Sequence, residues 1–236
     1  MDTVASTRSR ARRAVAAVAA VAALTGTVLV GGQAGASTPA ASSKAKANIA
    51  KVSDGTLAWG VSKYVLGANP AVMSLAETQK AEPPATVVVG TGWKFTDGTG
   101  TYDTKTGATL VSFPGALEFG NTSFGNYGFK FAEPTVALDA AGNGTLSADV
   151  SVRPAGAAAF GAAAETVIAN ITGATPTKTK KNVTVTLTPT AFADPLLAAA
   201  GDLSPFFKPT GSSNDGNKPP EPITLSFAYK AKAKKS

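Results

Sequence analysis

The sequence predicts an all-β protein, an antiparallel β-sandwich of about ten strands with one or two short helices. Short runs of β-branched and aromatic residues recur along the chain, and glycine, proline and aspartate separate them at regular intervals. Several runs also alternate apolar and polar residues: within residues 146–152, Leu146, Ala148 and Val150 share one face, and the residues between them are polar. At least one sheet should therefore have a buried face and a solvated face.

The expected strands follow this pattern from residue 86 onward. Asp97-Gly98 and Asn143-Gly144 offer residues that tolerate positive φ, and residues 103–107 form a longer loop that ends in glycine, so hairpins are expected over 92–113 and 134–153. The strands are expected at 86–89, 92–96, 109–113, 116–119, 127–132, 135–138, 144–153, 166–171, 183–188 and 223–229.

Two segments have helical features. Residues 56–66 place Leu57 and Val61 at helical spacing, and residues 192–203 are rich in alanine and leucine behind Asp194-Pro195. Both are short, so each would depend on packing against the sheet. Residues 209–222 are polar and contain several prolines and glycines, which predicts a long exposed loop.

The N-terminal 36 residues resemble an export signal. Four arginines precede an uncharged run over 14–30, and Ala34-Gly35-Ala36 offers a small-x-small cleavage site, so the mature protein is expected to begin at Ser37. An uncleaved anchor is the alternative, since the run approaches the length of a short membrane span. No apolar run of that length follows. We therefore expect a secreted or cell-surface protein without a membrane span after cleavage.

The remaining chain divides by composition into a folded part and two basic ends. Residues 37–51 form a flexible cationic linker, 52–229 a single domain, and 230–236 a disordered lysine-rich tail. After signal removal the chain carries 18 basic and 14 acidic residues, but residues 52–229 alone carry 11 and 14. A nucleic-acid-binding domain would concentrate basic residues on its folded surface, so this function is not expected. Lysine-rich ends suit anionic cell-wall polymers instead.

The chain contains no histidine and no cysteine. These residues supply the usual general bases, nucleophiles and transition-metal ligands near neutral pH, so Ser–His–Asp and Cys–His catalysis are excluded and no enzyme is expected. The absence of disulfides also means that a large core must stabilise the exported domain. The composition therefore favours a binding function.

An ordered set of short motifs resembles the HtaA domain, which occurs in exported and cell-surface proteins of actinobacteria. The resemblance spans roughly residues 52–227. The matching segments are 54–61 (DGTLAWGV), 64–65 (YV), 99–107 (TGTYDTKTG), 111–119 (VSFPGALEF), 131–136 (FAEPTV) and 144–150 (GTLSADV).

This resemblance implies a β-sandwich that binds haem during iron acquisition at the cell surface. In haem-binding members a tyrosine shortly after a Trp-Gly pair is the axial iron ligand, and Tyr64, which follows Trp59-Gly60, matches it. A histidine that hydrogen-bonds this tyrosine has its place after Phe119-Gly120, where this chain has Asn121. The spacing from Trp59 to Tyr64 is also about one helical turn shorter than in those members.

A tyrosine needs a cation or a hydrogen-bond donor to ionise near neutral pH. Asn121 can donate a hydrogen bond, and Lys63 or Arg153 are candidate cations. The alternative is a structural role, in which Tyr64 is partly buried and packs near Trp59. Phe206-Phe207 either pins the long loop to the sandwich or forms an exposed contact patch.

Two hypotheses follow. In the first, the chain is a haem-binding module with Tyr64, Asn121 and Trp59 at the haem and Tyr64 on the iron, which can pass haem to a relay protein. In the second, it is a cell-envelope interaction module that binds no haem, as the missing histidine and the shorter spacing suggest.

Overall fold

The structure, a computed structural model, describes residues 48–66, 78–123, 125–209, 216 and 218–230. The expected signal, the tail beyond Lys230 and the linker up to residue 47 lie outside these ranges. All described residues belong to one compact unit. Its strands are β1 Ile49–Trp59, β2 Thr78–Glu82, β3 Thr86–Val88, β4 Gly92–Asp103, β5 Thr109–Ser112, β6 Ala116–Asn121, β7 Tyr127–Leu138, β8 Gly144–Arg153, β9 Ala164–Ile171, β10 Pro176–Lys178, β11 Asn182–Leu187 and β12 Ile223–Lys230.

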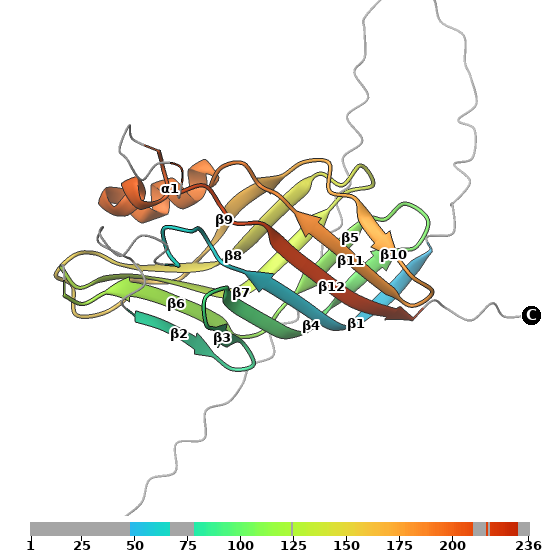
Figure 1. The fold of residues 1–236 in the computed structure, drawn as a ribbon, viewed down its shortest axis with the longest axis horizontal. Coiled ribbons are helices and arrows are strands. Elements are labelled where there is room, and N and C mark those ends of the chain that lie inside the picture. Colours follow the sequence, from blue (N-terminus) through green and yellow to red (C-terminus); the bar gives the residue numbers. More distant parts are fainter. Residues whose placement is uncertain (1–47, 67–77, 124, 210–215, 217, 231–236) are drawn as a thin grey trace, which may run out of the picture. The chain divides into compact units, whose positions relative to one another are not determined.

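The twelve strands form one antiparallel sheet, which confirms the all-β prediction. Its main path runs β10-β11-β12-β1-β4-β5-β7-β6-β2, while β8 and β9 continue from the other edge of β7. The sheet folds over at the short strand β5, so β1 and β12 face β7 and β8 across the core (Figure 1). Trp59 of β1 stacks on Phe131 of β7, although these two strands share no hydrogen bonds, and this contact marks where the two layers meet.

Aromatic side chains fill much of the interior. Alternation along each strand sends every second side chain inward, and the layers bury these residues almost completely. The largest fully buried side chains are Trp59, Trp93, Phe95, Tyr102, Phe113, Phe119, Phe129, Phe131 and Phe207. Such a core explains how a domain without disulfides can be stable.

The prediction of a helix at 56–66 is wrong: residues 56–59 are the end of β1, and residues 62–66 form only a single turn. The inward residues of β1 alternate, and the strand pairs with β12 on one side and β4 on the other. A β-bulge at Asp54, whose φ is 53°, interrupts this alternation by one residue, and the alternation continues after the bulge. Gly55 lies opposite Gly98, and a Cβ on Gly55 would come within 2.8 Å of the Gly98 Cα.

Three other expectations also change. Asp97-Gly98 is a bulge inside β4 instead of a hairpin turn, with Asp97 at φ 60°. The strands expected at 127–132 and 135–138 form the single strand β7, which kinks at Glu133 where φ is 51°. Strands β2 and β10 were not expected from the sequence.

The expected boundaries of the flexible ends are wrong by a few residues. Lys51 and Lys230, which were expected in the linker and the tail, lie opposite each other in β1 and β12. Their backbones therefore belong to the sheet, and β1 begins where β12 ends, at the same end of the sheet (Figure 1).

The helix expected at 192–203 is confirmed in position. It consists of α1 Asp194–Ala200, with Pro195 in its first turn, followed by the 3₁₀ helix η2 Gly201–Phe206. Buried Leu196 and Ala200 hold α1 against β8 and β9. Within the described ranges, no helix has the length and hydropathy to cross a membrane.

Candidate binding site

Tyr64 is presented by a single helical turn that directly follows β1. The Ser62 side-chain oxygen accepts a hydrogen bond from the Val65 N–H at 3.2 Å, and the Ser62 carbonyl accepts one from the Leu66 N–H at 3.1 Å. Val65 is fully buried, and this anchors the turn to the core. Ser62 therefore acts as a cap that holds Tyr64 at the end of the sheet.

The backbone that leads into this turn is strained. Val61 has a φ of 62°, which is a left-handed conformation that a β-branched residue rarely adopts. Two features stabilise this conformation of Val61: its side chain is fully buried, and its carbonyl accepts a hydrogen bond from the Glu221 N–H at 2.8 Å. Strain of this kind costs on the order of 1–3 kcal/mol and clusters at functional sites.

Three aromatic rings form a continuous stack at this end. Phe206 lies between Tyr64 and Tyr127, with ring centroids 6.0 Å and 5.0 Å away and interplanar angles of 24° and 26°. Neighbouring Phe207 points into the core and meets Phe129 at 4.8 Å. Phe206 and Phe207 thus pin the chain after η2 to the sandwich, as the first of the two alternatives predicted.

Asn121 belongs to the same cluster through β7. It ends β6, lies opposite Tyr127 in the strand pairing, and is 4% exposed. Since Tyr127 stacks on Phe206 and Phe206 on Tyr64, the two residues that the resemblance selects, Tyr64 and Asn121, contribute to one cluster.

Trp59 lies deeper than the other candidate residues. It is 1% exposed, and its ring stacks on Phe131 with a centroid distance of 5.9 Å. Its indole Nε1 is buried without a hydrogen-bond partner among the described residues. Trp59 therefore belongs to the core beneath the Tyr64 turn. Contact between Trp59 and a cofactor stays a prediction.

The cation beside Tyr64 is Lys218, which sequence reasoning missed. Its Nζ lies 6.0 Å from the centroid of the Tyr64 ring, and the residue is only 6% exposed. The prediction that 209–222 is exposed is therefore wrong at this position. Pro220 forms a bridge with Ser62, which draws the segment onto the Tyr64 turn.

The other two candidate cations lie elsewhere or are engaged. Arg153 donates a hydrogen bond from Nη2 to the Tyr127 carbonyl at 3.3 Å and lies over the Phe160 ring at 5.0 Å. Lys63 is exposed on the turn. The basic residue in ring contact with Tyr64 is thus Lys218, and Arg153 braces the far side of the stack.

Burial raises the pKa of the Tyr64 phenol above its ordinary value. A neighbouring cation acts in the opposite direction because it favours the phenolate. The raised pKa means that the phenol is neutral near pH 7. A ligand that coordinates the oxygen must therefore displace the proton.

The donor set suits one kind of metal group. In the described part of the chain, no cluster of three or more acidic residues can hold a metal ion. A phenol oxygen beside a cation and a buried amide fits a single axial bond to the ferric iron of haem, where a porphyrin supplies the other ligands. Segments 67–77, 124 and 210–215, which adjoin the cluster in sequence, lie outside the described residues.

Two pockets occur elsewhere on the described surface, and neither includes Tyr64. A larger one of about 660 Å³ lies between β8, β9 and α1 and is lined mainly by alanine and valine. A smaller one of about 230 Å³ lies at the opposite end of β1, where Lys178 and Thr106 contribute to its lining.

The fold defines an all-β domain, and the candidate site lies around Tyr64 at one end of it. The sequence model of the HtaA family (Htaa) matches residues 54–202. The chain belongs to the HtaA domain family.

Solved structures agree with this assignment at the level of the fold. The C-terminal domain of HtaA from Corynebacterium glutamicum superposes with a TM-score of 0.59 at 14% identity, covering 77% of this chain and 99% of that one. The N-terminal domain of the same protein gives a TM-score of 0.52 at 16% identity, covering 76% and 99%. Comparison with curated protein sequences gives no match.

Proposed function

We propose that this chain is an exported, cell-surface haem-binding protein that serves iron acquisition, with Tyr64 as the axial ligand of the haem iron. The signal in residues 1–36 would be removed, and the folded domain would bind haem and pass it to a relay protein. The observation that carries the proposal is the presentation of Tyr64: in a chain of the HtaA family, a strained and capped turn holds this phenol beside the buried cation Lys218.

The residues of the site have distinct tasks. Ferric haem supplies an open coordination position that a phenolate oxygen can fill. Tyr64 provides that oxygen, and Phe206 fixes the plane of its ring. Lys218 favours loss of the phenol proton, a role that the family gives to a different residue. Asn121 lies at the position of the family's histidine and contributes a neutral hydrogen-bond donor.

A haemin titration of purified residues 37–236 tests this function. We expect a saturable shift of the Soret band that is lost in Tyr64→Phe, because phenylalanine keeps the ring stack but has no oxygen ligand. Tyr229→Phe is the matched control, since Tyr229 is also half-buried but lies on β12 and packs on Tyr102. Binding that survives in Tyr64→Phe would contradict the assignment of the ligand.

Lys218→Gln separates the cation from the ligand. Removing the positive charge should weaken binding at pH 7, and raising the pH should restore part of the loss because hydroxide takes over removal of the proton. A uniform loss at all pH values would show that Lys218 only holds the fold.

The second candidate function is a cell-envelope interaction module without haem. The raised pKa of the Tyr64 phenol favours it, because the neutral phenol is a poor iron ligand. The absence of any Soret shift in the wild-type titration would remove the haem-binding function and leave this alternative.

A further inference from the structure

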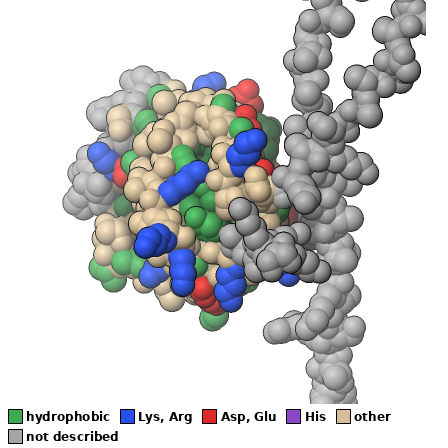
Figure 2. All heavy atoms as spheres, turned by 90° about the vertical axis from the view of Figure 1, so that its right-hand side faces the viewer, with side chains coloured by type: hydrophobic (Ala, Val, Ile, Leu, Met, Phe, Trp, Pro, Cys, Tyr) green, Lys and Arg blue, Asp and Glu red, His purple; other side chains and the backbone are tan. Residues whose placement is uncertain are grey.

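The end of the domain opposite to Tyr64 carries a dense group of lysines. We name it the lysine end; it comprises six exposed residues on neighbouring strands and turns. Figure 2 looks onto this end and shows basic side chains arranged around a hollow with an apolar floor. The members are Lys51 of β1, Lys105 of the β4–β5 loop, Lys178 of β10, Lys180 and Lys181 of the β10–β11 turn, and Lys230 of β12.

The positive charge at this end is not balanced by ion pairs. The two salt bridges found in the described residues join Lys80 to Glu118 and Lys130 to Glu82, and neither involves the lysine end. Moreover, Lys51 and Lys230 are directly opposite each other in the pairing of β1 and β12. Like charges in this position destabilise a sheet. The fold tolerates an arrangement that works against its own stability, which points to a role in binding.

The carboxylates nearest to these lysines are engaged by their own turns. Asp103 accepts hydrogen bonds from the N–H groups of Lys105 and Thr106 at 2.8 Å and 3.1 Å. Asp139 accepts bonds from the N–H groups of Ala141 and Asn143 at 2.8 Å and 2.9 Å. Both carboxylates thus shape loops. The six ammonium groups of the lysine end outnumber these two carboxylates, of which Asp139 also lines the pocket between the loops.

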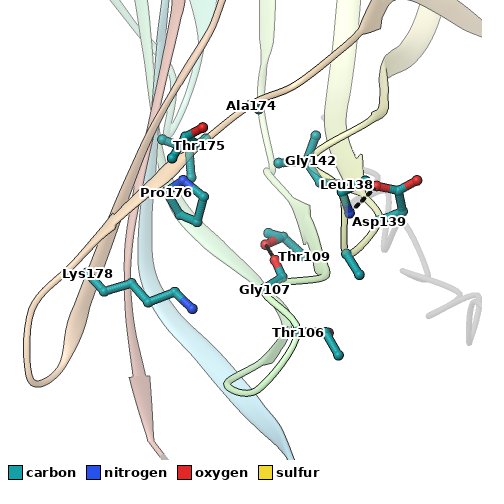
Figure 3. A pocket seen from close by; sticks show the side chains of 13 residues that line it. Thr106, Gly107, Thr109, Leu138, Asp139, Gly142, Ala174, Thr175, Pro176 and Lys178 are labelled. Atoms are coloured by element: carbon teal, nitrogen blue, oxygen red, sulfur yellow. Dashed lines mark hydrogen bonds between the residues drawn. The ribbon is translucent and has the colours of Figure 1, made fainter.

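A small pocket lies between these loops. It measures about 230 Å³, and Thr106, Thr109 and Thr175 place hydroxyl groups around it. Figure 3 shows that Lys178 reaches across from β10 towards the loop of Thr106 and Gly107. The Lys178 Nζ lies 5.4 Å from the centroid of the buried Tyr102 ring, which helps to hold the ammonium at the pocket mouth. A pocket of this size would hold one anionic group of a ligand together with the adjoining hydroxyl-bearing unit of the same ligand.

The chain ends continue the same charge in the sequence. β1 begins and β12 ends at the lysine end, so residues 37–47 and 231–236 are joined to it directly. These segments contain Lys44, Lys46, Lys232, Lys234 and Lys235 but no acidic residue.

The residue types indicate which anion is bound. All six cations are lysines, which act as point charges and do not provide the planar fork with which arginine recognises a single carboxylate or phosphate. A row of point charges fits a repeating anion. The aromatic residues at this end, Tyr102 and Tyr229, pack on each other with centroids 5.2 Å apart, so no ring is set out for stacking on nucleic-acid bases.

We propose that the lysine end docks onto an anionic envelope polymer with repeating phosphodiester groups, and that one phosphate unit enters the pocket beside Lys178. Residues Lys51 to Trp59 of β1 separate this surface from the Tyr64 turn by roughly 26 Å, at about 3.3 Å per residue. The docked protein would thus keep the Tyr64 end free. The location of the polymer in the envelope rests on the export in the proposed function, but the binding chemistry does not.

The test uses purified residues 37–236 and immobilised poly(glycerol phosphate) as the probe. The double variant Lys51→Gln/Lys181→Gln should bind on the order of tenfold more weakly than the wild type, and rising salt should weaken the wild type steeply. The control Lys80→Gln/Lys94→Gln removes two exposed lysines outside the lysine end and should change binding less than about twofold. The haemin titration should be unaffected in both variants, which separates this proposal from the proposed function.

Three results would overturn the proposal. The first is an equal loss of binding in the two double variants. The second is complete loss of binding in residues 37–230, which keep Lys230 of β12 but lack the C-terminal tail, with no effect of Lys51→Gln/Lys181→Gln, since the tail alone would then carry the interaction. The third is equally tight binding to a DNA duplex, which would show a surface for polyanions in general.

Discussion

Replacement by alanine should destabilise the domain far more at Phe207 than at its neighbour Phe206. Phe207 is 2% exposed and makes edge-to-face contacts with Phe129, Phe192 and Phe119 at centroid distances of 4.8, 5.0 and 6.4 Å. Phe206 is half-buried and stacks only on Tyr64 and Tyr127. One residue therefore belongs to the core and the other to the candidate site.

The magnitudes follow from these environments. Phe207→Ala removes a fully buried ring and leaves a cavity, so the free energy of unfolding should fall by about 3–5 kcal/mol. For a domain of this size that corresponds to a drop in Tm of roughly 6–20 °C. Phe206→Ala loses two stacked pairs on a partly solvated surface, and about 1–2 kcal/mol is expected.

Urea unfolding followed by tryptophan fluorescence measures both changes. Trp59 and Trp93 are each 1% exposed, so their emission should shift on unfolding. A haemin titration of the folded variants then gives the second readout. Phe206→Ala should lower the free energy of haem binding by more than it lowers the free energy of unfolding, because the Tyr64 ring loses its stacking partner.

The reasoning would be refuted if Phe206→Ala destabilised the domain as much as Phe207→Ala. It would also fail if Phe207→Ala cost less than about 1 kcal/mol, since the ring could not then be the core contact described.

Three further predictions concern the phenol, the lysine pair and a strand glycine. Burial raises the pKa of the Tyr64 phenol, so the contribution of the neutral phenol to stability should be complete below about pH 10 and disappear as the pH rises through the pKa of the folded state. The difference in absorbance at 295 nm between wild type and Tyr64→Phe should titrate above the ordinary value of 10.0, and titration below that value would contradict the prediction. Lys51→Glu puts a carboxylate opposite Lys230 and should raise the free energy of unfolding by about 0.2–1 kcal/mol in a urea titration, whereas a loss of stability would show that the two lysines do not repel each other. Gly100→Ala should destabilise by about 1–3 kcal/mol or more, because its Cβ would lie 1.9 Å from the Leu110 carbonyl oxygen; Gly161→Ala, whose nearest contact is 3.5 Å away, should be close to neutral, and equal effects would be inconsistent with the β4–β5 pairing.

Strands with strict alternation were predictable from sequence. In β8, Leu146, Ala148 and Val150 are buried as the pattern predicts, and the expected hairpin with β7 forms, although its turn spans residues 139–143 with Gly142 at φ 76° and Gly144 already belongs to β8. These features depend on neighbours in sequence, and local pattern therefore suffices.

Elements whose partners are distant in sequence were not predictable in the same way. The apolar spacing in 56–66 is compatible with both a helix and a strand, and only pairing with β12 and β4 selects the strand. Asp97-Gly98 has the residues of a turn, but it lies opposite Gly55, so the sheet uses it as a bulge. Tertiary pairing overrides local preference at both places.

The candidate site shows the same division. The resemblance selected Tyr64 and Asn121, and the structure brings both to one cluster. Lys218 escaped detection because its surroundings have loop composition, and its burial depends on the bridge between Pro220 and Ser62. The lysine end was missed because Lys51 and Lys230 were assigned to the flexible ends, and because residues 52–229, which hold the other four lysines, are acidic on average. The six lysines converge only when the strands pair.

The sequence by itself determined the all-β class, the family, the absence of histidine and cysteine chemistry, and the tyrosine on which haem binding would depend. Only the tertiary structure decided which cation stands beside that tyrosine, which phenylalanine stacks on it, and where the lysines gather. The physical reason is that composition and alternation are properties of neighbouring residues. Electrostatic and aromatic contacts instead join residues far apart in the chain, and these meet only after the strands have paired.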